Sequence, residues 1–321
     1  MPEKVALGLD VGGTSIKSAL VTHKGEMLHK SSTPTTTHSE KAGLVNLISH
    51  IIQKLIDSLD SQSTLSGVGI GIPGNVCRQK GLIRGAYNLP ALVNFSLTNE
   101  LAKTIPYPIF IDNDATNAAK GEFLFGAGKG QDHMLMLTIG TGIGGGIILN
   151  RRVFHGVTDY AGEVGHMTLV KDGMACSCGN HGCFEAYASS TAMIRYAREA
   201  VRRESPSSLQ KVPVEAIDGK IISQLAIDGD EVCITIIRTL GHYIGLAISN
   251  IINLLNIPLV VVGGGVSECG DMLFQEIEKS CQDHVLPFLR DTYSIKKALL
   301  GNDAGVIGSA STVFMKGETV Y

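Results

Sequence analysis

Short apolar runs that end in glycine alternate along this chain with segments of helical periodicity. Residues 5–28 contain an apolar run, a Gly-Gly turn, a second apolar run and a further turn, which predicts a β-hairpin leading to a third strand. Apolar positions recur at helical spacing over 43–59, and 65–74 returns to a strand. This alternation is typical of an α/β protein.

The second half of the chain repeats this design. A strand, a glycine turn and a strand are predicted over 133–154, and a strand, three glycines and a helix over 257–281. Between the halves, a strand at 108–115 runs directly into a helical stretch at 116–126, and the polar segment 202–213 predicts a surface loop between helices. We therefore expect two related halves, each opening with a glycine-turned hairpin.

Length and charge narrow the class of protein. A chain of 321 residues is long enough for two domains with a large core. Its net charge of -3, and the absence of any Lys/Arg cluster longer than Arg202 and Arg203, argue against a nucleic-acid partner. The N-terminal residues resemble neither a signal peptide nor a transit peptide, so we expect a cytoplasmic protein.

The most apolar segment, 244–262, does not predict a membrane span. It contains three asparagines and Pro258, and a buried helix followed by a buried strand accounts for it better. No membrane partner is expected.

Three of the seven cysteines are crowded into eight positions. An odd number of cysteines in a reducing compartment argues against a disulfide framework. Cys176, Cys178 and Cys183 offer three soft thiolates, enough for a structural zinc site if one more nitrogen or sulfur ligand is present. Three nearby histidines could supply it: His155, His166 and His181. Four protein ligands would leave no open position for a catalytic water.

Glycine clusters supply the second chemical signal. Gly140, Gly142 and Gly145 satisfy G-x-G-x-x-G, but a strand follows instead of the helix that a dinucleotide site needs. Glycine-rich hairpin turns bring backbone N–H groups close to phosphates, although each could also be only a tight turn. Asp10, directly before Val-Gly-Gly-Thr, is placed to hold Mg²⁺ or its waters beside a triphosphate, and Thr14 can donate a hydrogen bond.

Together these motifs resemble a known superfamily. The segments 8–17, 138–147 and 261–266 resemble the two phosphate motifs and the adenosine motif of the sugar kinase, actin and Hsp70 superfamily. More narrowly, "GVTDYAGEVGHMTL" at 156–169 followed by "CSCGNHGCFE" at 176–185 resembles the signature of the ROK family of repressors, open reading frames and kinases. The resemblance covers essentially the whole chain.

This resemblance implies a fold and its cofactors. The fold is the α/β, two-lobed actin-like ATPase (ribonuclease H-like) fold, with ATP and a sugar in a cleft that closes between the lobes. We expect an N-terminal lobe over 1–120, with a C-terminal helix at about 303–321 packing back on it, and a larger lobe over 121–302 that carries the zinc loop. The residues expected at ATP and Mg²⁺ are Asp10, Gly12, Gly13, Thr14, Lys17, Gly140, Thr141, Gly142, Gly263, Gly264 and Gly265.

The family pattern also assigns the zinc and the sugar. It selects His166 to complete the Cys₃His site with Cys176, Cys178 and Cys183, which leaves the second ring nitrogen of His166 for the sugar. Taken alone, Glu163 and Glu185 would be read as surface charges. The residues that match the family's sugar contacts are Gly74, Asn88, Asn113, Asp114, Glu163, His166 and Glu185.

Asp114 is the expected catalytic base. It follows a buried strand and opens a helix, so it could be only an N-cap, but the family's catalytic aspartate matches it. Asp112 and Thr116 replace the commoner Glu and Asn of this motif, and Arg78 stands where an acidic residue is frequent. The tryptophan often found near Asn94 is missing as well. These departures bear on which sugar is bound more than on the reaction.

The expected function is ATP-dependent phosphorylation of the 6-hydroxyl of a hexose, glucose before N-acetylglucosamine or N-acetylmannosamine. A sugar-responsive repressor of the same family would need a helix-turn-helix domain before Asp10, for which ten residues leave no room. A sensor without catalysis would leave Asp114 idle. A homodimer or higher homo-oligomer is expected.

Overall fold

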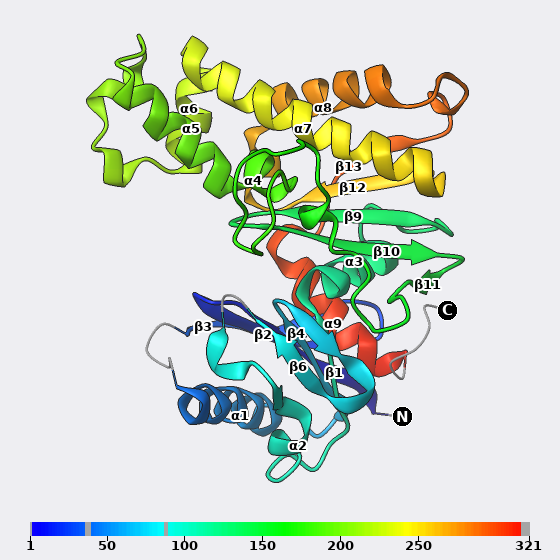
Figure 1. The fold of residues 1–321 in the computed structure, drawn as a ribbon. Coiled ribbons are helices and arrows are strands. Elements are labelled where there is room, and N and C mark those ends of the chain that lie inside the picture. The colour runs from blue at the N-terminus through cyan, green and yellow to red at the C-terminus, as the bar shows by residue number, and fades with distance from the viewer. Residues whose placement is uncertain (1, 36–39, 87–88, 316–321) are drawn as a thin grey trace. The chain divides into compact units, whose positions relative to one another are not determined.

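The computed structural model describes residues 2–35, 40–86 and 89–315, and these divide into two compact units. Unit 1 holds the described residues of 1–136, 146–162 and 298–321, and unit 2 holds 137–145 and 163–297. The chain passes between the units within β9 (Met134–Ile139) and again within β10 (Ile143–Leu149). Both units are mixed α/β (Figure 1).

Two five-stranded sheets share one strand order. The first has the order β3-β2-β1-β4-β8, and the second has the order β11-β10-β9-β12-β13. If the strands of each sheet are numbered 1 to 5 along the chain, both sheets have the spatial order 3-2-1-4-5. The remaining strands of the first sheet are β1 (Glu3–Val11), β2 (Ser15–Thr22), β3 (Met27–Pro34), β4 (Ser63–Ile72) and β8 (Ile109–Asn113). Those of the second are β11 (Arg152–Val153), β12 (Leu259–Gly263) and β13 (Ser294–Lys297). The prediction of two related halves, each opening with a glycine-turned hairpin, is confirmed.

Helices and a small sheet complete the two units. In unit 1 these are α1 (Lys41–Asp57), α2 (Leu97–Leu101), α3 (Asp114–Phe125), α9 (Ala304–Phe314), and a three-stranded sheet of β5 (Asn75–Cys77), β6 (Leu82–Gly85) and β7 (Phe95–Ser96). In unit 2 they are α4 (Glu185–Ala188), α5 (Ser190–Arg202), α6 (Gly219–Ile227), α7 (Glu231–Leu255) and α8 (Asp271–His284).

The first sheet is covered on both faces. Successive side chains along its strands point to opposite faces, and both faces carry apolar residues. Ile16 and Leu20 of β2 belong to the core that α1 fills with side chains such as Ile48 and Ile52. Residues of opposite parity, such as Ala19, join the second core, to which α9 contributes. In Figure 1, α1 and α9 accordingly lie on opposite sides of this sheet.

Helix α9 packs unusually close to its neighbours, and glycine makes this possible. A Cβ atom on Gly8 would lie 2.2 Å from the carbonyl oxygen of Val306, and one on Gly69 would lie 1.8 Å from that of Ser309. On α9 itself, a Cβ atom on Gly308 would lie 1.6 Å from the carbonyl oxygen of Asn117 in α3. The lobe boundary expected near residue 120 stays a prediction; α3, which spans that position, packs on α9 within unit 1.

Helix α7 is long and apolar enough to cross a membrane by length and composition alone. However, 56% of its apolar stretch is buried inside the protein, where α7 packs against α8 and the shorter helices of unit 2. It is followed by the buried strand β12, as the sequence predicted for 244–262. We therefore interpret α7 as a core helix.

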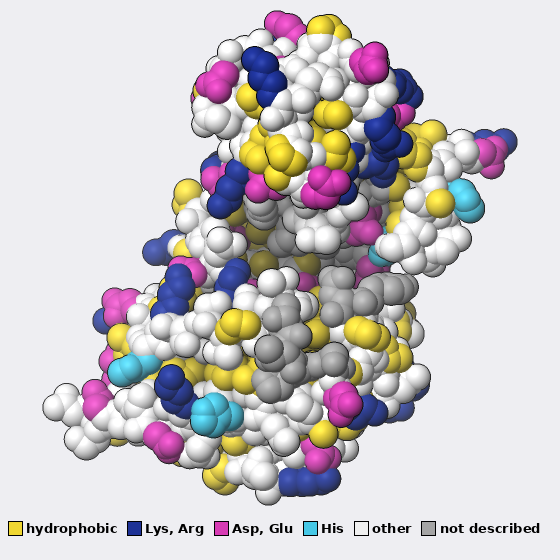
Figure 2. Space-filling model, turned by 90° about the vertical axis from the view of Figure 1, so that its left-hand side faces the viewer, with side chains coloured by type: hydrophobic (Ala, Val, Ile, Leu, Met, Phe, Trp, Pro, Cys, Tyr) yellow, Lys and Arg dark blue, Asp and Glu magenta, His cyan; other side chains and the backbone are white. Residues whose placement is uncertain are grey.

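Charged side chains of both signs are interspersed on the face of the molecule in Figure 2. This surface matches the modest net charge of the chain.

The contact between α9 and α3 predicts the effect of a single methyl group. Gly308→Ala should lower the free energy of unfolding by about 2 kcal/mol or more, because the new Cβ must displace backbone on α3. The thermal unfolding midpoint measures this. Gly219→Ala is the matched control: its Cβ would meet only the Met193 sulfur, at 3.7 Å, so its midpoint should stay unchanged or rise slightly. Equal midpoints for the two variants would contradict the packing argument.

Candidate active site

Polar residues gather at one edge of the first sheet, where its parallel strands end. In the strand register Asp10 of β1 lies opposite Gly71 of β4, and Gly71 lies opposite Asp112 of β8. Asn113 and Asp114 come next along the chain. The carboxyl ends of parallel strands are where α/β proteins place their ligands, so Asp10 and Asp114 share the expected edge.

Asp114 is not the N-cap of the helix that it opens. The N-cap of α3 is Asn113, whose side-chain oxygen accepts a hydrogen bond from the Thr116 N–H at 3.0 Å. The N-cap interpretation of Asp114 is therefore wrong. Asp114 is instead the first helical residue, half-buried, with its Oδ1 2.9 Å from the Ala115 nitrogen. The helix N-terminus favours a negative charge at this position.

Asn113 ties the active-site edge to the loop that follows β4. Its side-chain nitrogen donates to the carbonyl oxygen of Gly74 at 3.1 Å. Gly74 has a φ of 110°, and a Cβ atom there would lie 2.1 Å from the Gly85 carbonyl oxygen, so glycine is required at this turn. Asn88, the other expected sugar contact of this loop, lies outside the described residues. The sugar-binding roles of these residues stay predictions.

Near Asp114, the carboxylate of Asp112 is buried and surrounded by a lysine, an arginine and a histidine. Its Oδ2 lies 2.6 Å from Nζ of Lys120, 2.9 Å from Nε2 of His155 and 3.4 Å from Nε of Arg78. Asp112 and Lys120 are 2% and 1% exposed, which makes them a buried ion pair. Burial alone would raise the pKa of Asp112, but Lys120, His155 and Arg78 together hold it well below its usual range.

This carboxylate joins four parts of unit 1. Lys120 also donates to Asn117 of α3 at 2.9 Å and to Thr312 of α9 at 2.8 Å. Arg78 follows β5, and its NH1 lies 3.0 Å from Nδ1 of His155. The Arg78 backbone N–H donates to Asp159 at 3.0 Å. Because His155 is held by Asp112 and Arg78, it is not among the residues that cluster with the cysteines.

This network was not predicted from the sequence. The only sequence signal was Lys120 in the helical stretch "NAAKGEF", because a lysine that is buried needs an anionic partner. The partner is eight residues away, and the hydroxyl of Thr312 is 192 residues away. Only the tertiary structure could identify both.

The first glycine hairpin connects β1 and β2. The Gly12 N–H donates to the Ser15 carbonyl at 2.9 Å, and Gly13 and Thr14 are exposed at its tip. Lys17 lies opposite Asp10 in the register, with its ammonium 3.4 Å from the Asn302 carbonyl oxygen. Burial raises the pKa of Asp10, and Lys17 partly opposes that shift. A carboxylate next to exposed backbone N–H groups has the chemistry that a hydrated Mg²⁺ and a phosphate chain need.

The second glycine hairpin, in unit 2, is held by Glu185. Its Oε2 accepts a hydrogen bond from the Ile143 N–H at 2.8 Å, and a Cβ atom on Gly142 would lie 2.4 Å from that same oxygen. Thr141 receives a hydrogen bond on its carbonyl from the Thr191 hydroxyl at 2.8 Å, and the carbonyl of Gly140 accepts one from the Ser190 N–H. Glu185 thus supports the turn as well as being an expected sugar contact.

The glycines at the end of β12 lie beside this hairpin. Gly264 has a φ of 89°, and a Cβ atom there would lie 2.5 Å from the carbonyl oxygen of Ile139, the residue before Gly140. Gly263 ends the strand, and a Cβ atom on Gly265 would meet nothing within 4 Å. Unit 2 therefore brings two of the three glycine motifs together.

Three cysteines and one histidine form a compact cluster in unit 2. The ligand atoms of His166, Cys176, Cys178 and Cys183 all lie within 4.8 Å of one another. Cys178 Sγ lies 3.7 Å from Cys183 Sγ, and Cys176 Sγ lies 3.7 Å from Nδ1 of His166. Tetrahedral zinc with bonds of about 2.3 Å to sulfur and about 2.0 Å to nitrogen requires ligand separations of roughly 3.5–3.8 Å. The two pairs at 3.7 Å match this spacing, and the donor set of three thiols and one imidazole suits zinc.

The loop that holds the cluster is cross-linked by its own backbone. Thr168 bridges to Cys183 and Ala175 to His181, so the thiols are carried on a small folded loop. Burial and the neighbouring thiols raise the pKa of Cys183 to about 12. Since a neutral thiol binds metal poorly, only a cation in the cluster would hold Cys183 as a thiolate at neutral pH. His181 and His155 are not in the cluster, which leaves His166 as the nitrogen ligand.

Two carboxylates face this cluster. Oε2 of Glu163 lies 3.9 Å from Nε2 of His166, the ring nitrogen that does not face Cys176. Burial raises the pKa of Glu163, His166 partly opposes this shift, and the negative charge of Glu185 adds to it. Glu163, His166 and Glu185 are therefore neighbours in unit 2, as the family pattern implied, while their contacts with a sugar stay a prediction.

Comparison with known proteins covers nearly the whole chain. The sequence model of the ROK family matches residues 6–315. A glucokinase of Halalkalibacterium halodurans is 38% identical over 312 residues, which are 96% of this chain and 94% of the relative. The structure of a ROK family glucokinase from Streptomyces griseus, in complex with glucose and AMPPNP, matches with a TM-score of 0.85 at 31% identity, over 97% of this chain and 99% of that one.

A regulator is similar as well. The structure of a ROK family transcriptional regulator, a homologue of the E. coli MLC protein, matches with a TM-score of 0.87 at 28% identity. The match covers 97% of this chain and 78% of the regulator. These matches confirm the predicted actin-like ATPase fold class, but fold alone does not separate a kinase from a regulator.

The buried Asp112 network predicts a large stability effect. Asp112→Asn should lower the free energy of unfolding by about 3–5 kcal/mol at pH 7, because Lys120 would be left buried without its counter-ion. Urea unfolding measures the change. The exposed pair Lys103–Glu100 provides the control, since Glu100→Gln should change stability by less than about 1 kcal/mol.

The same contacts set a pH dependence. The pKa of Asp112 is lowered in the folded state, so its contribution is complete above the unfolded pKa and is lost as the pH falls below about 4. Asp112→Asn should remove that part of the acid sensitivity. An unchanged acid unfolding profile in this variant would contradict the assignment.

Proposed function

Because the chain belongs to the ROK family, we propose that it is an ATP-dependent glucokinase that transfers the γ-phosphate of ATP to the 6-hydroxyl of glucose. The sequence relatives named glucokinase support the reaction and the sugar. The observation that carries the proposal is Asp114, a carboxylate at the ligand edge of the first sheet whose helix is capped by a different residue. A hexose is the small-molecule partner, and a homo-oligomer in the cytoplasm completes the proposal.

Asp114 acts as the general base. As the 6-hydroxyl oxygen attacks the γ-phosphorus, its proton passes to the Asp114 carboxylate, the new O–P bond forms and the bond to the leaving ADP oxygen breaks. Phosphoryl transfer depends mainly on position and charge neutralisation, so one base and a set of phosphate ligands are sufficient. The nearby carboxylate of Asp112 repels the Asp114 charge only weakly, because Lys120 and its neighbours neutralise Asp112.

The glycine hairpins and the end of β12 hold the nucleotide in this proposal. Backbone N–H groups of Gly12, Gly13 and Thr14, with the Lys17 ammonium, bind the phosphates from unit 1. Gly140, Thr141 and Gly142 do so from unit 2, and Gly263, Gly264 and Gly265 approach the adenosine. Asp10 would hold Mg²⁺ through its waters, and the ion would neutralise phosphate charge.

The sugar and the zinc belong to one construction in unit 2. Glu163, the free side of the His166 ring and Glu185 bind sugar hydroxyls, with Gly74, Asn88 and Asn113 contributing from unit 1. Zn²⁺ held by His166, Cys176, Cys178 and Cys183 would have a structural role, because four protein ligands close its coordination. It would orient the His166 ring and keep the loop that presents Glu185 in place.

Replacement of the base tests the catalytic proposal. Asp114→Asn should reduce kcat with glucose by about 10²–10⁴-fold while glucose binding changes little, because only the transfer step loses its proton acceptor. ADP release coupled to a spectrophotometric assay measures this across glucose, mannose, fructose, allose and the N-acetylated hexosamines. Asp57→Asn, an exposed position at the end of α1, serves as the control. Full activity in Asp114→Asn, or binding of sugars without turnover in the unaltered protein, would overturn the kinase proposal.

Metal removal tests the zinc proposal. Strong chelation should release about one zinc per chain and lower the thermal unfolding midpoint, because ligand binding to the folded state is lost. His166→Ala should lose the metal in the same way. His181→Ala is the matched control, since His181 is exposed in the same loop but outside the cluster, and should keep its zinc. Metal content by mass spectrometry decides between them, independently of activity.

A further inference from the structure

A second polar pocket lies in unit 1, between α1 and strands β2 and β3. Its volume is about 410 Å³, the size of a small-molecule site. Strand β3 is the outer strand of the first sheet, and α1 does not cover the face of the sheet completely at this edge. None of the residues assigned above to the nucleotide, the sugar or the metal lines it.

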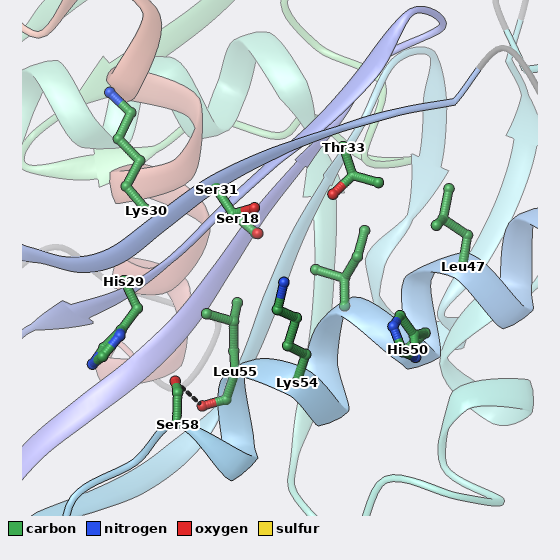
Figure 3. A pocket seen from close by; sticks show the side chains of 11 residues that line it. Ser18, His29, Lys30, Ser31, Thr33, Leu47, His50, Lys54, Leu55 and Ser58 are labelled. Carbon is green, nitrogen blue, oxygen red and sulfur yellow. Dashed lines mark hydrogen bonds between the residues drawn. The ribbon is translucent and has the colours of Figure 1, made fainter.

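The floor of the pocket contains a buried hydroxyl without a partner. Ser18 of β2 is 1% exposed, and its Oγ makes no hydrogen bond with any described residue. A buried polar atom left unsatisfied costs about 1–3 kcal/mol, so such an atom in a pocket wall indicates a ligand position. Ser31 lies directly opposite Ser18 in the strand register. In Figure 3 the Ser18 and Ser31 hydroxyls lie side by side.

The other wall supplies a positive charge. Lys54 projects from α1 across the pocket, and in Figure 3 its ammonium points towards Ser18 and Ser31. Within the described part of the chain, Lys54 forms no ion pair, whereas Lys30, at the rim, points away and pairs with Asp303 at 2.5 Å. Among the described residues no Asp or Glu lines the pocket, while His29 and His50 stand at its ends. The potential in the pocket therefore favours an anion.

The remaining lining is apolar. Leu47, Ile51 and Leu55 of α1 form one side, and the Thr33 hydroxyl points in from β3 (Figure 3). The hydroxyl of Ser58 is already used, since it donates to the Leu55 carbonyl at 2.8 Å. The hydroxyls of Ser18, Ser31 and Thr33 have no hydrogen-bond partner among the described residues. Together with one ammonium group, they match the several acceptor oxygens of a phosphate group better than the two of a carboxylate.

We propose that this pocket binds a small organic phosphate, with the phosphate group between Ser18, Ser31 and Lys54 and an apolar body against Leu47 and Ile51. The site is separate from the residues proposed to bind the phosphates of ATP. It does not depend on the kinase proposal, because every residue in it lies on α1, β2 or β3, except Ser58, which directly follows α1. Its floor is nevertheless the strand that carries Lys17, one residue before Ser18.

Site-resolved titration of the full chain tests the proposal. Phenyl phosphate should shift the amide NMR signals of Ser18, Ser31, Thr33 and Lys54 saturably, and inorganic phosphate should do so more weakly. Benzyl alcohol, which has the apolar ring without the charge, should leave them unchanged. Equal shifts with benzyl alcohol would mean only an apolar crevice, and no saturable shifts with phenyl phosphate would overturn the site.

Variants separate the site from general electrostatic attraction. Lys54→Gln should weaken phenyl phosphate binding about tenfold, because it removes the positive charge, and Ser18→Ala about threefold, because it removes one hydrogen-bond donor. Ser18→Ala leaves no native contact broken, so its fold should be preserved. Lys24→Gln, an exposed lysine in the β2–β3 turn that does not line the pocket, is the charge-matched control and should bind like the unaltered protein. Equal weakening by Lys24→Gln and Lys54→Gln would contradict the proposal.

Discussion

The arrangement of unit 1 depends on one buried carboxylate. Asp112 can be ionised without water only because Lys120, His155 and Arg78 surround it, and each of these groups comes from a different part of the chain. Lys120 extends the network to α9 through Thr312. Asp114 lies two residues further on, so the position of the proposed base is tied to the neutralisation of its neighbour. A charge that must be compensated thus fixes the end of β8, where catalysis requires precision.

In unit 2, one side chain also connects several parts of the structure. Glu185 follows Cys183 by two residues, and its carboxylate accepts a hydrogen bond from the glycine hairpin at Ile143. The cysteine loop, an expected sugar contact and an expected phosphate turn are therefore mechanically connected. This connection would give a physical reason for the proposed zinc site, since the proposed chemistry does not use the metal. A loop of polar residues without a core of its own is held in one conformation by its ligands.

Much of the fold could be predicted from local sequence patterns, but less of the candidate active site could be predicted in this way. Alternating apolar runs and glycine turns predicted both hairpins, and the family resemblance selected His166 from three histidines. The sequence pattern could not identify the N-cap of α3, because both Asn113 and Asp114 are suitable N-cap residue types. The structure shows that Asn113 is the N-cap. The partners of Asp112 come from distant segments, so no spacing rule reveals them. Ser18 reads as an ordinary strand residue because its missing partner is a property of packing.

The packing of α9 on the first sheet affects the order in which the protein folds during synthesis. Unit 1 is built from three separate stretches of chain, and its second core includes Val306, Ala310 and Val313. A ribosome delivers these side chains only after it has made all of unit 2. During synthesis, the first sheet must therefore wait with the face towards α9 uncovered, while unit 2 is free to fold earlier.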